Sequence, residues 1–133
     1  MSVTRLLMID DEPYIGALVR RVAEGLDYEM RFVTLADEFK RTHRSLDPDV
    51  VILDLSMPDI DGIELLKFLA TEKSRARILI LSGFDARILN GARRLGEDRG
   101  LHMAGIVSKP VRIAELRTIL ETLKTTQPDR PND

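Results

Sequence analysis

The sequence predicts an α/β fold of three layers, in which helices cover both faces of a five-stranded parallel sheet. Five short apolar or alternating runs are typical of strands, and each is followed by a longer segment with helical spacing of apolar residues. Most of the short runs are apolar at every position, which indicates strands that are buried on both faces. Right-handed crossover connections leave few topologies for such an alternation.

The predicted strands are short and bounded by polar or turn residues. The run Tyr28–Val33 alternates polar and apolar residues, which predicts a strand with one more exposed face near the sheet edge. The other runs predict buried strands at Leu6–Ile9, Val50–Leu53, Ile78–Leu81 and Gly105–Val107.

The predicted helices are delimited by proline and glycine. Pro13 suits the first turn of the first helix, and Gly25 suits its end. The residue before Pro48 disfavours the helical region, so the second helix should close there. Gly100 is a plausible C-cap for the fourth helix. The remaining helices are expected at Ala36–Leu46, Ile63–Ala70 and Ala86–Arg99 and from Ile113 onward.

Length and composition indicate one domain and exclude several classes of function. We expect residues 1–124 to form the domain and residues 125–133, with two prolines and no apolar periodicity, to form a polar tail or the start of a linker. The absence of cysteine excludes thiol chemistry and zinc-thiolate sites. A net charge of -2 argues against direct nucleic-acid binding. No apolar run suits a membrane span and no signal peptide is evident, so a cytoplasmic protein is expected.

Polar residues follow the predicted strands at the points where the strands end. Asp10 and Asp11 follow the first run, Asp54 ends the third, Ser82 ends the fourth and Lys109 follows the fifth. Ligands of open α/β sheets bind outside the carboxyl ends of the strands, so these side chains should converge on one rim. Three carboxylates and one ammonium leave an excess of negative charge, which predicts a Mg²⁺ ion, with Mn²⁺ as a substitute. Asp54 could then act as a nucleophile toward a phosphoryl group.

Each of these features also has a purely structural interpretation. The acidic residues from Asp10 to Glu12 could have no role other than to stabilise the N-terminus of a helix that starts at Pro13. Asp54 and Ser82 could be turn residues, and Lys109 could lie in a solvated loop. The occurrence of all of them at successive strand ends favours a common site. The histidines, His43 and His102, do not lie among the strand-end residues and suit surface or packing roles.

Residues 3 to about 124 resemble the receiver domain of two-component response regulators. The most specific block is DLSMPDIDG at 54–62, which is similar to the phosphoacceptor segment of that family. The resemblance implies a flavodoxin-like strand order, 2-1-3-4-5, and a phosphoryl group carried by Asp54 and bound by Ser82 and Lys109. It also implies a Mg²⁺ site formed by Asp10, Asp11, Asp54 and the backbone carbonyl of Ser56.

The resemblance further implies partners and an output surface. A sensor histidine kinase or a histidine phosphotransfer protein would donate the phosphoryl group. An output domain or effector would respond, with a phosphorylation-linked homodimer as one form of output. The surface around the fourth and fifth helices would change. The sequence that starts at Ser82 and the sequence from Gly105 to Pro110 resemble the corresponding segments of receivers that precede cyclic-dinucleotide phosphodiesterase domains. Ile106 departs from the family, which commonly has an aromatic residue three positions before the lysine.

Two other functions compete with a phosphorylation switch, which is not a turnover enzyme. A constitutive pseudo-receiver that binds partners without phosphorylation is favoured by Ile106 and disfavoured by the full set of acceptor-site residue types. A Mg²⁺-dependent phosphohydrolase is the less favoured alternative. Haloacid-dehalogenase-type phosphatases carry a second Asp where this chain has Ser56, and the chain leaves little length for a substrate cap.

Overall fold

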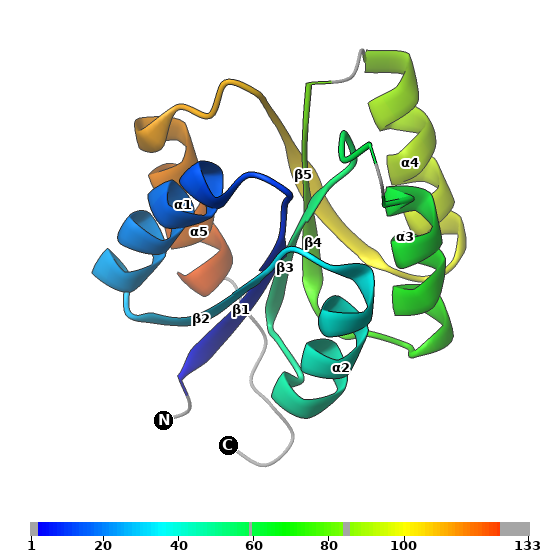
Figure 1. Cartoon of the computed structure of the whole chain (residues 1–133), viewed down its shortest axis with the longest axis horizontal. Helices are drawn as coiled ribbons and strands as arrows, with labels where there is room; N and C mark the ends of the chain where they lie inside the picture. The colour runs from blue at the N-terminus through cyan, green and yellow to red at the C-terminus, as the bar shows by residue number, and fades with distance from the viewer. Residues whose placement is uncertain (1–2, 59, 84–85, 126–133) are drawn as a thin grey trace.

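The computed structural model describes residues 3–58, 60–83 and 86–125 and has five parallel strands in the order β2-β1-β3-β4-β5 (Figure 1). The fold class and strand order expected from the sequence are confirmed. The strands are β1 (Thr4–Ile9), β2 (Tyr28–Val33), β3 (Val50–Asp54), β4 (Arg77–Ser82) and β5 (His102–Ser108). The helices are α1 (Pro13–Gly25), α2 (Ala36–Leu46), α3 (Gly62–Thr71), α4 (Ala86–Asp98) and α5 (Ile113–Thr125). Within the described ranges, each helix is too short or too polar to cross a membrane.

Two hydrophobic layers lie on opposite faces of the sheet. Alternate residues of a strand point to opposite faces, so Leu7 and Ile9 of β1 join the core under α2, α3 and α4, whereas Leu6 and Met8 join the core under α1 and α5. Figure 1 shows the same arrangement, with α1 and α5 on one side of the sheet and the other helices on the opposite side. Helices on both faces explain why the central strands are apolar at nearly every position.

The largest departure from the predicted elements is β5. The sequence predicts a buried strand at Gly105–Val107, but the strand runs from His102 to Ser108 and lies at the edge of the sheet. Val107 is its buried residue, and His102 and Ala104 are exposed. A bulge inserts Ala104 between two residues that pair with consecutive positions of β4. The polar tail expected at 125–133 lies outside the described residues apart from Thr125, which ends α5.

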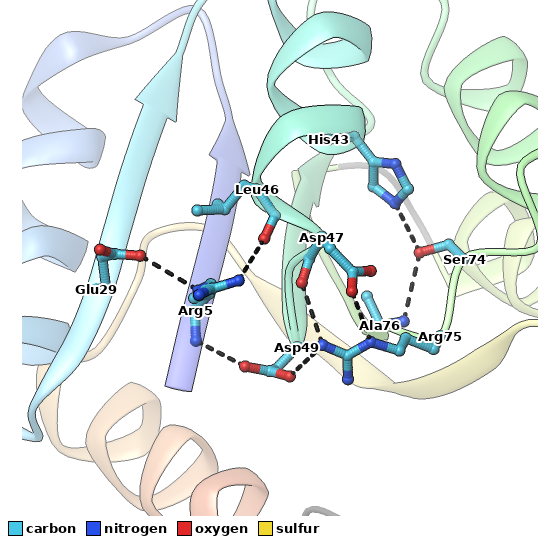
Figure 2. Close-up of polar contacts among 9 residues, drawn as sticks. All are labelled: Arg5, Glu29, His43, Leu46, Asp47, Asp49, Ser74, Arg75 and Ala76. Atoms are coloured by element: carbon cyan, nitrogen blue, oxygen red, sulfur yellow. Dashed lines mark hydrogen bonds and ion pairs between the residues drawn. The ribbon is translucent and has the colours of Figure 1, made fainter. Parts of the chain in front are cut away.

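A polar cluster joins two connections, α2 to β3 and α3 to β4, to the first residues of β1 (Figure 2). The buried Asp49 carboxylate accepts a hydrogen bond from the backbone N–H of Arg5 at 2.8 Å and pairs with the Arg75 guanidinium at 2.8 Å. Arg75 also contacts Asp47 at 3.2 Å, and Arg5 donates to the carbonyl of Leu46 at 3.1 Å. The cluster therefore anchors the end of α2 and the segment before β4 to β1, at the end of the strands opposite Asp10 and Asp54.

His43 connects α2 to the segment between α3 and β4. Its Nε2 lies 2.8 Å from the Ser74 hydroxyl, and its ring packs against the edge of Phe68 and beside Phe39. Burial lowers the pKa of the His43 imidazole below its ordinary value, against the opposing effects of Glu72 and Asp47. The packing role expected from the sequence is therefore the one that the structure gives this histidine.

We expect the stabilising contribution of His43 to decline in acid. Below pH 6.5 the unfolded chain protonates this imidazole while the folded chain resists protonation, so stability falls as the pH is lowered through that value. This contribution is measured by urea unfolding of the native chain and of His43→Gln. The difference between their midpoint urea concentrations should be smaller at pH 5.5 than at pH 7.5. The exposed His102, changed to Gln, is the control. A gap that is constant with pH would contradict the prediction.

Candidate functional site

The strand-end residues predicted from the sequence converge at the C-terminal ends of the strands. Asp10 directly follows β1, Asp54 is the last residue of β3, Ser82 is the last residue of β4 and Lys109 directly follows β5. The side chains of Asp10, Asp54 and Ser82 have no solvent exposure. The backbone N–H of Lys109 donates to the carbonyl of Ser82 at 3.1 Å, so the ends of β4 and β5 are joined there.

The Lys109 ammonium lies among three carboxylates. Its Nζ is 3.0 Å from Glu12 Oε1, 3.1 Å from Asp54 Oδ2 and 3.3 Å from Asp10 Oδ2. Burial favours the neutral amine, but the ion pairs outweigh burial and raise the pKa of Lys109 above its ordinary value. Lys109 is thus a fixed positive charge at neutral pH, and the interpretation as a solvated loop residue is wrong.

The two oxygens of Asp54 have different partners. Oδ1 accepts hydrogen bonds from the backbone N–H of Ser56 at 2.8 Å and from the Ser56 hydroxyl at 2.7 Å. Oδ2 faces Lys109. The carboxylate is therefore held in one orientation from both sides, although it lies at the end of a strand where the chain turns.

The acidic residues after β1 form a second part of the site. Asp10, Asp11 and Glu12 each offer a carboxylate oxygen, and these oxygens lie within 4.8 Å of one another. Asp10 is buried, whereas Asp11 and Glu12 are exposed. Asp10 Oδ1 accepts the backbone N–H of Glu12 at 2.9 Å, and no hydrogen bond from the described residues reaches Oδ2, whose contact is the ion pair with Lys109.

These residues fit a Mg²⁺ ion. The donors are oxygens of carboxylates, which this hard cation prefers. With Asp54 included, four carboxylates and one ammonium give a net charge of -3 when all are ionised. Burial, with the Asp54 charge as a further contribution, raises the pKa of Asp10 to about 6, although the N–H of Glu12 and Lys109 act in the opposite direction. A divalent cation would offset this electrostatic cost, and Asp10 and Asp11 are among the carboxylates that could hold it.

The purely structural interpretation of the acidic run also fails in part. Glu12 is the N-cap residue of α1, but its side chain makes no capping hydrogen bond. Instead it pairs with Lys109, a contact that the sequence analysis missed. The available signal was its position beside Asp10 and Asp11, but sequence alone does not reveal that a residue 97 positions away approaches it.

Ile106 is partly buried against the core under α4.

Comparison with known proteins identifies the family. The sequence model of the response regulator receiver domain matches residues 6–121. This chain belongs to that family. Among curated relatives, the cell cycle response regulator CtrA of Brucella ovis is 30% identical over 120 residues, which are 90% of this chain and 51% of that protein. This receiver domain therefore spans about half the length of the CtrA proteins that it matches.

Solved receiver structures agree with this fold. A response regulator from Colwellia psychrerythraea has a TM-score of 0.76 and 30% identity, with 95% of this chain and 100% of that chain covered. The receiver domain of the Francisella response regulator 1452 has a TM-score of 0.75 and 26% identity, with 93% and 99% covered. The chemotaxis response regulator CheY4 of Vibrio cholerae, at 21% identity and a TM-score of 0.77 over 92% and 99%, supports the fold alone.

Proposed function

We propose that this receiver domain is a phosphorylation switch that accepts a phosphoryl group on Asp54 in a Mg²⁺-dependent reaction. The donor would be a sensor histidine kinase or a histidine phosphotransfer protein. The observation that carries the proposal is the position of Lys109, whose ammonium bridges Asp54 and the acidic residues after β1. A buried carboxylate beside a fixed cation and a set of oxygen ligands is suited to phosphoryl transfer, which depends on positioning and charge neutralisation.

The proposal gives each residue one task. Asp54 attacks phosphorus, and the bond from phosphorus to the donor breaks as the new bond to the carboxylate oxygen forms. Lys109 and the Ser82 hydroxyl would bind the phosphoryl oxygens. Asp10, Asp11, Asp54 and the backbone carbonyl of Ser56 would hold Mg²⁺, with Mn²⁺ as a substitute; this ion would neutralise charge on the phosphoryl group.

The proposal includes an output surface and partners. The backbone N–H of Lys109 donates a hydrogen bond to the Ser82 carbonyl. A change at the phosphoryl group should therefore affect the segments after β4 and β5 together. The surface around α4 and α5 would then engage an output domain or effector, and a second copy of the chain is one form of that partner. We also propose that residues 1–124 form the domain and that the protein is cytoplasmic. The likeness to receivers attached to phosphodiesterase domains stays a prediction.

The decisive experiment is intact mass after incubation with acetyl phosphate. The native chain should gain one phosphoryl group in the presence of Mg²⁺ and none after chelation with EDTA. Asp54→Asn removes the nucleophilic oxygen and should abolish the gain, whereas Asp98→Asn, on the exposed surface of α4, should leave it unchanged.

The alternative functions give different results in the same experiment. A phosphohydrolase would consume the donor continuously without a stable gain in mass, and the consumption would require Asp54. A constitutive pseudo-receiver would bind Mg²⁺ with the donor intact and the mass unchanged. Either result would overturn the proposed switch.

A further inference from the structure

We propose that Met103 is a site of reversible oxidation, at which a hydroperoxide converts the thioether to a sulfoxide and thereby loosens α4 from β5. The chain has no cysteine, so methionine sulfur is its most readily oxidised group. Among the described residues, Met8, Met30 and Met57 are buried, with 5% exposure or less, whereas Met103 is only partly buried. Met103 is therefore the methionine that an oxidant in solution reaches first.

The first half of β5, where Met103 lies, is open to solvent. His102 and Ala104, on either side of Met103 in the chain, are exposed, and β5 is an edge strand of the sheet. This part of the strand also borders an open pocket of about 340 Å³, whose lining includes Met103, Arg77 and Leu123. A small oxidant can thus approach Met103 without unfolding of the sheet, whereas it reaches a fully buried sulfur only when the structure opens.

The Met103 side chain occupies the place that a side chain on α4 would take. Gly96 is one of the buried residues of α4, with Leu89 and Ala92. A Cβ atom on Gly96 would lie 2.4 Å from the Met103 sulfur and 3.0 Å from its Cγ. The last turns of α4 therefore rest directly on the thioether, and the contact requires both glycine at position 96 and an apolar side chain at position 103.

The oxidation step transfers one oxygen atom. The Met103 sulfur attacks the hydrogen-bearing oxygen of the hydroperoxide, the S–O bond forms, and the O–O bond breaks. The leaving oxygen departs with the electron pair of that bond and takes the proton from the transferred oxygen, so the products are the sulfoxide and either water or an alcohol. Sulfur loses two electrons and the peroxide gains them. Methionine sulfoxide reductases reverse this change.

The sulfoxide cannot replace the thioether against α4 without cost. The S–O group is strongly polar, and its burial against the apolar core without a hydrogen bond is unfavourable. If the side chain instead turns into water, the space beside Gly96 is left empty, because glycine has no side chain to fill it. Both outcomes remove packing from the C-terminal half of α4, a 13-residue helix whose stability depends on such packing. α4 is part of the proposed output surface, so an effect on output rests on the proposed function, whereas the oxidation itself does not.

The test exposes the unphosphorylated native chain to hydrogen peroxide and follows each methionine by peptide mass. Met103 should be oxidised at least about tenfold faster than Met8, Met30 and Met57, whose sulfurs are reached only on opening. After oxidation of Met103, the backbone amides of residues 92–98 should exchange hydrogen about tenfold faster, and those of α1 should be unchanged. The midpoint of thermal unfolding should fall by about 5 °C. Methionine sulfoxide reductases of both stereospecificities should restore the native exchange.

Substitutions separate the role of the sulfur from that of the position. Met103→Leu keeps an apolar side chain of similar volume, so the exchange of α4 should be close to native both before and after treatment with peroxide. Met103→Gln places a polar group at the same position and should give the rapid exchange of α4 without any oxidant. Met30→Leu, in β2 and in the core under α1 and α5, is the control and should respond to peroxide as the native chain does.

The possible failures are distinct. If Met103 is oxidised no faster than Met30, or if its oxidation leaves the exchange of α4 unchanged, the inference is overturned. It is also overturned if Met103→Leu shows the peroxide response of the native chain, because another residue would then be responsible. If the native chain gains no phosphoryl group from acetyl phosphate, the proposed function fails instead, since the exchange measurement requires no phosphorylation.

Discussion

Replacing Lys109 by Met should lower the free energy of unfolding by about 3 kcal/mol at pH 7.5 without metal, because breaking a buried ion pair leaves charge uncompensated. The ammonium lies within 3.3 Å of Glu12, Asp54 and Asp10, and the last two are fully buried. The variant should also slow phosphorylation by acetyl phosphate about 100-fold, as expected when one group that stabilises transition-state charge is removed. Urea unfolding and intact mass measure the two effects.

Lys67→Met is the matched control, because that lysine forms an exposed ion pair with Glu64 on α3. Such pairs contribute about 0–1 kcal/mol, so the control should unfold close to the native midpoint. Adding Mg²⁺ should recover part of the stability of Lys109→Met, since a cation would again lie among the carboxylates. Equal midpoints for Lys109→Met and the native chain would contradict the prediction.

Asp10→Asn should stabilise the metal-free protein, by about 2 kcal/mol at pH 7.5, because the ionised carboxylate is buried beside Asp54 and opposes folding. The amide keeps an oxygen to accept the N–H of Glu12. The same change should weaken metal binding: without the Asp10 charge, Mg²⁺ affinity should fall by at least about tenfold, since the loss of even an outer-shell partner of a metal ligand costs about 10–100-fold. Isothermal titration with Mg²⁺ measures the second effect.

The pH dependence of the Asp10 effect has a defined sign. Burial raises the pKa of Asp10 from 3.8 to about 6, so the folded chain holds this proton where the unfolded chain has lost it. The native chain should therefore lose stability as the pH rises from about 4 to about 6, while Asp10→Asn lacks this component. Asp37→Asn, an exposed carboxylate in the first turn of α2, is the control. A native advantage over Asp10→Asn at pH 7.5 would contradict the assignment.

The sequence predicted β2 and α2 accurately and β5 poorly, although β2 and β5 are both edge strands. The bounds of β2 and α2 agree with the structure, since alternation defines β2 and Pro48 limits α2. β1 extends back to Thr4, beyond its predicted start, because polar residues at the beginning of a strand break the apolar pattern. The first half of β5 was missed because strand prediction depends on a continuous apolar run or on regular alternation. The exposed residues of β5 interrupt the run, and its bulge interrupts the alternation.

The candidate site was predictable to the extent that it follows strand ends. Asp10, Asp54, Ser82 and Lys109 lie at those ends because parallel strands finish at a common edge. The contact between Glu12 and Lys109 joins residues far apart in the chain through long side chains, which no local pattern encodes. The hydroxyl bond of Ser56 depends in the same way on a side-chain rotamer.

The bulge at Ala104 decides which way the end of β5 faces. Met103 and Ile106 both pack toward the core under α4, although they are three positions apart, and Val107 packs toward α1 and α5. In a regular strand, residues an odd number of positions apart point to opposite faces, and a slip of one residue inverts every later side chain. The extra residue thus determines the face of the sheet to which each later side chain of β5 points. It also affects the position of the Lys109 ammonium, which follows the strand. A one-residue insertion or deletion in the first half of β5 would therefore act on the chemistry of the site at the far end of the same strand.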